Sequence, residues 1–132
     1  MSVRVYWHDD QKTILYQVYE GKCVAADFHT CVNEAYHLVK AVDHTVDIIV
    51  DMTHATFVGT SFLAVRSTSE AKVQENQRLA ILVGAPSFIK ALINISKKVA
   101  PKTTKNMHYV NTVEEAHTII AKASEVSEQH TN

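Results

Sequence analysis

The sequence predicts an α/β fold: a small sandwich with a mixed, mostly parallel sheet, opened by an antiparallel β-hairpin and flanked by about four helices. Two alternating apolar stretches, residues 3–7 and 14–19, open the chain around a polar turn. Two mainly apolar stretches, 46–52 and 79–83, are typical of strands buried on both faces. Segments with the helical period lie between and after these runs, and this alternation favours parallel strands with right-handed crossovers.

The opening hairpin is expected to turn at the polar residues 8–12 and to end at Glu20-Gly21. A helix should follow, beginning between Val24 and Asp27. Its apolar residues recur three and four positions apart, which places them on one face: Phe28, Cys31, Val32, Ala35, Leu38, Val39 and Val42.

After the strand at 46–52 we expect a short loop and a second helix from about residue 60 to residue 76. The strand at 79–83 then leads through a Gly-Ala-Pro turn to a third helix, which Ser87 can cap.

The last strand is predicted at 107–110, and a capping box from Thr112 to Glu115 starts the last helix. Because the chain is polar from about Ser124, that helix is expected to fray there. The prediction is therefore one domain, 1–123, with a polar tail at 124–132.

Composition narrows the function classes. A chain of 132 residues is enough for one domain with a real core. The net charge of −1 gives no electrostatic footprint for nucleic acid. No apolar run is long enough for membrane insertion, and the N-terminus lacks the apolar stretch of a signal peptide, so the expected location is cytoplasmic. Cys23 and Cys31 are expected to be free structural thiols.

No catalytic motif stands out. Three glycines cannot form a Gly-rich dinucleotide loop, and there is no Walker sequence. None of the eight histidines forms a metal-binding pair on one helix. The sequence therefore predicts a protein that is not an enzyme and has no metal and no cofactor.

The most informative stretch links the strand at 46–52 to the second helix. Asp51 ends the apolar run, and Gly59, Thr60 and Ser61 precede the next helical pattern. One interpretation is a helix cap, with Thr60 or Ser61 as the cap and Gly59 as the turn. The other is an anion or phosphate site, because the first amides of a helix have no internal partner and lie at its positive end.

The stretch "DMTHATFVGTSFLAV" resembles the signature region of STAS domains, the family of bacterial anti-sigma-factor antagonists and sulfate-transporter tails. The phosphorylated serine of the antagonists falls on Thr60, and the next serine falls on Ser61. Gly59 stands where the family has aspartate, and Phe62 where it has glycine, so the usual hydroxyl-and-carboxylate arrangement is absent. The stretches "RLAILVGAPSFIKALINI" and "HYVNTVEEAHTIIA" also resemble later units of the family.

The resemblance implies a non-enzymatic regulatory or protein-binding module, of the partner-switch type. Its implied partner is an anti-sigma factor or a Ser/Thr kinase, and a homodimer is a further option. The candidate docking residues surround the same stretch: Asp51, Thr53, Phe57, Phe62 and Arg66. The alternative is a small-ligand domain for a lipid or a nucleotide, in which Phe57, Phe62 and Phe88 line an apolar pocket.

Asp51 also resembles the acceptor aspartate of a response-regulator receiver, with Asp9-Asp10 imitating the acidic pair. In a receiver, however, the acidic pair leads into a helix, whereas here it leads into a predicted strand. We therefore interpret Asp51 as a strand-end residue that binds amides of the following loop.

Overall fold

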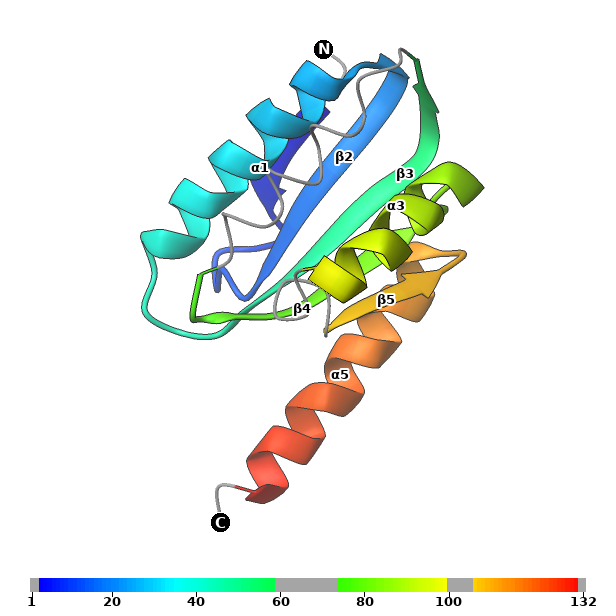
Figure 1. Ribbon diagram of the computed structural model, residues 1–132. Coiled ribbons are helices and arrows are strands. Elements are labelled where there is room, and N and C mark those ends of the chain that lie inside the picture. The colour runs from blue at the N-terminus through cyan, green and yellow to red at the C-terminus, as the bar shows by residue number, and fades with distance from the viewer. Residues whose placement is uncertain (1–2, 59–73, 100–105, 131–132) are drawn as a thin grey trace.

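The computed structural model describes residues 3–58, 74–99 and 106–130 (Figure 1). Within these ranges, five strands form one sheet in sequence order: β1 (Val3–Trp7), β2 (Ile14–Cys23), β3 (Val46–Phe57), β4 (Gln77–Val83) and β5 (Met107–Val110). The β1–β2 pair is antiparallel and the other pairs are parallel. The predicted mixed sheet opened by a hairpin is confirmed.

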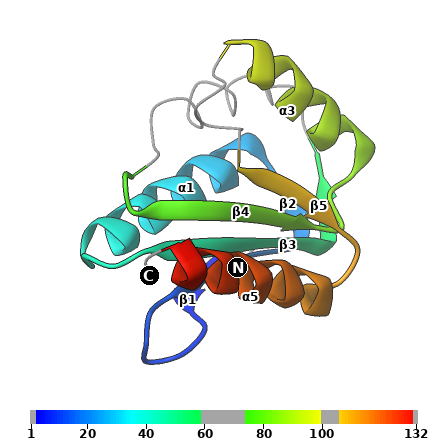
Figure 2. The same ribbon diagram turned by 90° about the horizontal axis from the view of Figure 1, so that it is seen from below.

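The described helices are α1 (Ala25–Lys40), α3 (Ser87–Val99) and α5 (Val113–His130). Figure 2 shows α1 and α3 on one side of the sheet and α5 on the other. Each side buries its own apolar cluster, and a parallel sheet covered on both faces explains the near-continuous apolar runs of β3 and β4. The predicted second helix lies mostly outside the described residues, and its expected end, residues 74–76, is a turn rather than helix.

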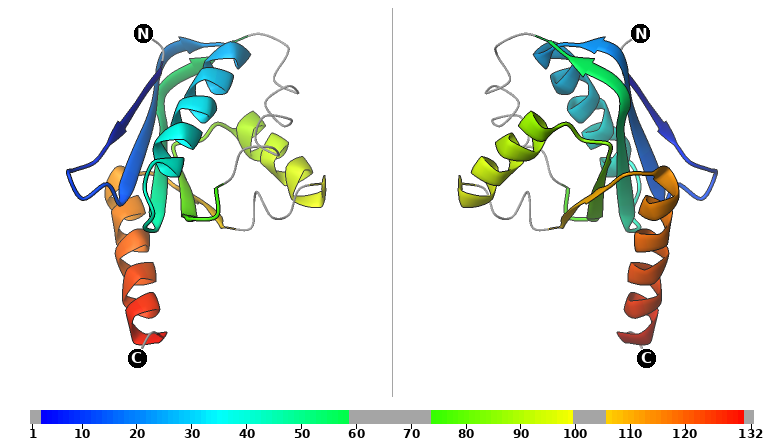
Figure 3. Two further views of the ribbon diagram at one scale, coloured as in Figure 1. Left: turned by 90° about the vertical axis from the view of Figure 1, so that its left-hand side faces the viewer. Right: turned by 90° about the vertical axis from the view of Figure 1, so that its right-hand side faces the viewer.

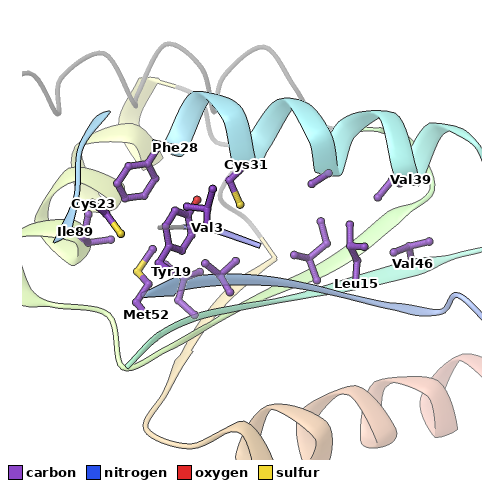
Figure 4. Packing of buried hydrophobic residues seen from close by; sticks show 14 residues of the cluster. Val3, Leu15, Tyr19, Cys23, Phe28, Cys31, Val39, Val46, Met52 and Ile89 are labelled. Carbon is purple, nitrogen blue, oxygen red and sulfur yellow. The ribbon is translucent and has the colours of Figure 1, made fainter. Parts of the chain in front are cut away.

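The larger cluster fills the space between the sheet and α1 (Figure 4). Tyr19 and Phe28 point toward each other there, with ring centroids 4.9 Å apart. Cys23 and Cys31 lie in the same cluster, and both are buried. Burial raises the pKa of Cys31 to about 12, so this thiol stays protonated and packs as a small apolar side chain.

The hairpin turns where the sequence predicted. The His8 N–H donates to the Ile14 carbonyl, and the Gln11 N–H donates to the Asp9 carboxylate. The end of β2 was predicted too early, because the strand passes through Glu20-Gly21 and ends at Cys23. Gly21 has a φ of +67°, a backbone conformation that glycine adopts without strain, and pairing with β3 continues on both sides of it.

Strand β3 is also longer than predicted. It continues past Met52 to Phe57, so most of the expected loop is strand. The local sequence of this stretch is polar and does not show a buried run, but β2 supplies hydrogen-bonding partners from Glu20 to Cys23. Long-range pairing therefore extends both strands together, beyond the point at which their apolar patterns stop.

Helix α1 begins at Ala25, within the predicted window. The Val24 N–H donates to the Asp27 carboxylate at 2.7 Å, which satisfies a backbone group at the helix start. At the other end, the Asn76 side-chain amide donates to the carbonyls of Val39, Val42 and His44. One asparagine thus fixes the turn before β4 against the end of α1.

Helix α3 differs from the prediction in the position of its first residue. Ser87 is its first residue rather than its cap, and the Pro86 carbonyl accepts from the amides of Ile89 and Lys90.

The predicted capping box at the start of α5 forms one of its two expected hydrogen bonds. The Glu115 N–H donates to Thr112 Oγ1, while the Glu115 carboxylate accepts from Asn111 rather than from the cap. The helix then continues to His130, so the expected fraying from Ser124 is not observed. No glycine or proline interrupts this stretch, and alanine, glutamate and glutamine favour helix.

Candidate functional site

Three of the candidate docking residues, Asp51, Thr53 and Phe57, lie on the outer half of β3. Beyond Asp51, which pairs with Val83, the β4 partner ends, and among the described strands only β2 continues beside β3. A bulge between Val18 and Glu20 shifts the register at this point. The last residues of β3 therefore form a two-stranded extension with β2.

Asp51 is half-buried and lies on the α5 side of the sheet, since its neighbours Val50 and Met52 belong to the α1 side. Its carboxylate accepts a hydrogen bond from the Thr53 N–H at 3.0 Å. The strand-end position predicted for Asp51 is wrong, because β3 continues to Phe57, and the amide that Asp51 binds belongs to the strand and not to a loop. Asp51 is one of the groups that raise the pKa of Tyr16, after burial and Tyr6.

Thr53 is exposed and lies against the turn that follows β4. Gly84 has a φ of +66°, and a Cβ built there would stand 3.2 Å from the Thr53 Cα. The Gly84 N–H donates to the Val110 carbonyl at 3.0 Å, which joins this turn to β5. A glycine is therefore needed where the chain leaves β4 and passes close to β3.

Phe57, the last residue of β3, lies on the α1 and α3 side. Its ring is 5.1 Å from Phe28 and 5.8 Å from Phe88, measured between centroids. Phe88 is 40% exposed and Val24 is 43% exposed. Val24 directly follows Cys23, the residue of β2 that pairs with Phe57. Apolar surface is thus exposed around the end of β3.

Asp51 and Phe57 face opposite sides of the sheet, so the structure does not bring these two candidates onto one surface. Thr53 and Phe57 both lie in the two-stranded extension. Gly59, Thr60, Ser61, Phe62 and Arg66 lie outside the described residues. The phosphoacceptor assignment to Thr60 and Ser61 stays a prediction.

The structure also shows a cluster that the sequence analysis missed. Tyr16 Oη lies 2.6 Å from His117 Nε2, joining β2 to α5. The His8 ring stands 4.9 Å from the His117 ring, and Tyr6 stacks on Tyr16 at 5.5 Å. Burial lowers the pKa of His117, and the neighbouring His8 lowers it further, while Glu114 acts in the opposite direction. A neutral His117 can accept a hydrogen bond from the Tyr16 hydroxyl through Nε2.

One sequence signal could have found His117. It lies four residues after Val113 and three before Ile120, so it falls on the apolar stripe of the last helix. A histidine on such a stripe faces the sheet and needs a polar partner there. His8 is exposed and His117 is half-buried, and the fold makes these two histidines neighbours.

Among the described residues, no group of three or more His, Cys, Asp or Glu side chains is arranged to hold a metal ion. No helix in the described ranges is both long and apolar enough to cross a membrane.

No protein-family profile matches the sequence. No curated protein matches it either. Among solved structures, the fold is similar to that of an uncharacterized DUF3478-family protein with a SpoIIAA-like fold from Shewanella loihica PV-4. The TM-score is 0.61 at 9% identity, over 89% of this chain and 92% of that one. The protein therefore has a SpoIIAA-like α/β fold, as the resemblance to STAS domains implied.

Proposed function

We propose that this chain is a non-enzymatic regulatory module that binds a protein partner through the end of β3 and the starts of α1 and α3. The observation that carries the proposal is the exposed apolar surface around Phe57, to which Val24 and Phe88 contribute. Exposed apolar side chains grouped at one end of a sheet favour a protein contact, and aromatic residues supply much of the binding energy in such contacts.

The partner class comes from the resemblance: an anti-sigma factor or a Ser/Thr kinase. The predicted phosphoacceptors, Thr60 and Ser61, follow Phe57 by three and four positions in the chain. A phosphate on Thr60 adds about two negative charges at neutral pH. Desolvating these charges in an apolar contact is costly, so phosphorylation would weaken partner binding.

The first test purifies the protein from its own host cells and reads co-purifying proteins and the modification of Thr60 and Ser61 by mass spectrometry. The affinity of the identified partner is then measured for Phe88→Asp, for Thr60→Glu and for the control Lys122→Asp. The control places the same aspartate on an exposed position of α5, far from the proposed surface. We expect both test variants to lose roughly tenfold or more in affinity, and the control to bind like the unchanged protein.

Equal affinity for Phe88→Asp and Lys122→Asp would contradict the docking surface. Full affinity for Thr60→Glu, with Phe88→Asp impaired, would contradict the switch and leave the docking surface standing.

A second candidate function is binding of a lipid or a nucleotide in an apolar site beside the helix start. The contact between Phe57 and Phe88 supports it, because two of the three predicted lining residues do lie together. Native mass spectrometry of the protein from host cells distinguishes the two candidates. A bound small molecule that Phe88→Asp releases would favour the ligand domain, and the bare protein mass would count against it.

A further inference from the structure

The outer edge of β1 is a second surface of this fold that is suited to binding another chain. β1 lies at one end of the five-stranded order, and among the described strands it pairs only with β2. Figure 3 shows β1 as the outermost strand, beside the hairpin turn. Its sequence, VRVYW, has no proline and no glycine bulge, and Arg4 is its only charged residue. The usual protections of an edge strand are therefore few.

The hairpin bonds identify the backbone groups that face this open edge. The His8 N–H donates to the Ile14 carbonyl, and His8 continues the register in which Trp7 stands opposite Leu15. In an antiparallel pair, hydrogen-bonded and non-hydrogen-bonded positions alternate. Positions 4, 6 and 8 therefore bond to β2, and the N–H and C=O groups of Val3, Val5 and Trp7 point outward.

These outward groups are spaced to pair with a second copy of the same strand. With a two-fold axis at Val5, that residue stands opposite Val5 of the copy, and Val3 stands opposite Trp7 of the copy. All outward-facing positions then form hydrogen-bonded pairs, about six bonds in total. No other register of this short strand with itself uses all three positions.

The side chains suit the same register. Arg4 stands opposite Tyr6 of the copy in a non-hydrogen-bonded pair, in which side chains approach most closely. Within one chain the Arg4 guanidinium already lies 5.7 Å from the Tyr6 ring centroid, so these two side chains form a cation–π contact even without the copy. On the other side of the sheet, Val5 and Trp7 are only partly buried and would be covered by the same residues of the copy.

We propose that two copies of this chain pair antiparallel through β1, with the two-fold axis at Val5, so that the five strands of each copy join in one continuous sheet. The surface lies away from Phe57 and Phe88, and the inference does not rest on the proposed partner binding. It assigns β1 as the surface of self-association.

Sedimentation equilibrium of the full chain over a range of concentrations tests the pairing. We expect a dimer that Val5→Pro weakens by roughly tenfold or more, because each copy loses one intermolecular N–H donor. The Val5 N–H serves no β2 bond, and an edge strand tolerates proline at such a position, so circular dichroism and the melting temperature should stay close to those of the unchanged protein. A monomer at every concentration would overturn the proposal, as would a dimer that Val5→Pro leaves intact.

Cross-linking tests the register separately. Under mild oxidation we expect Val5→Cys to form a disulfide-linked dimer more readily than Tyr6→Cys, because position 5 meets itself and position 6 meets position 4. Tyr6 is 42% exposed, so random collisions would favour the control instead. The native cysteines are both buried and contribute little background. Equal or faster cross-linking of Tyr6→Cys would overturn the register.

Discussion

The two faces of the sheet are stabilised by different kinds of contact with the helices that cover them. The face under α1 and α3 buries large side chains, among them Tyr19, Phe28 and Leu15. The face under α5 buries a smaller apolar cluster and adds specific polar contacts. Arg78 donates to Asp47 at 2.6 and 2.9 Å and to Ser124 of α5 at 3.1 Å, and Tyr16 bonds to His117.

This difference separates two sources of stability. Apolar burial is non-directional and roughly proportional to area, so the α1 face should tolerate small changes of shape and respond strongly to lost volume. The α5 contacts are directional and depend on charge state, so this face should respond to single polar atoms and to pH.

The largest expected effect is a cavity on the α1 face. Phe28 is 5% exposed and packs on Tyr19 and Phe57, so Phe28→Ala should lower the free energy of unfolding by about 3–5 kcal/mol. Phe88→Ala removes the same ring from a 40% exposed position and should cost far less. Urea unfolding of both variants checks this, and equal losses would contradict the assignment of Phe28 to the core.

Removing a charge from the α5 face should come next. Asp47 is almost fully buried and also accepts the Leu79 N–H at 3.1 Å, so Asp47→Ala leaves both that amide and the Arg78 guanidinium without their acceptor. We expect a loss of about 3 kcal/mol in the free energy of unfolding. The double variant with Arg78→Met should recover part of the loss, because no uncompensated charge is left. A double variant as unstable as the sum of the singles would contradict a paired role.

Two glycines provide a smaller, matched comparison. Gly84 and Gly21 have nearly the same positive φ, but only Gly84 has backbone atoms of Thr53 where a Cβ would stand. Gly21→Ala should cost about 1 kcal/mol for the backbone conformation alone. Gly84→Ala should cost more, because the turn after β4 must also move away from β3. Thermal unfolding ranks the two, and a larger loss at Gly21 would contradict the close approach at Thr53.

The smallest expected effect is a pH dependence of the α5 face. Because folding lowers the pKa of His117 from its ordinary value of 6.5, the unfolded chain takes up this proton first as pH falls. The stabilisation is therefore present above the ordinary pKa and is lost as the pH drops below it. Urea unfolding at about pH 7.5 and pH 5.5 should show a smaller decrease for His117→Gln than for the control His108→Gln, an exposed histidine of β5. Equal decreases in the free energy of unfolding of the two variants would contradict His117 as the source of the pH dependence.

Much of the fold could be predicted from the sequence. The order of the described elements, the hairpin turn, the start of α1 and the first bond of the Thr112 cap all depend on residues close together in the chain. The ends of β2 and β3 could not be predicted, because each continues only where the other supplies backbone partners. Of the candidate site, a short-range amide contact of Asp51 was predictable since it spans two residues, but its place inside a strand was not, because β3 continues there beside β2.

By itself, the sequence determined which segments form strands and helices and which of their faces are apolar, because the periods of 2 and 3.6 are local properties. Only the tertiary structure decided which side chains meet across those faces. Tyr16 and His117 are separated by 101 positions, and Asp47 and Arg78 by 31. Such contacts depend on strand order, register and the placement of α5 over the sheet, and these follow from the packing of the whole chain.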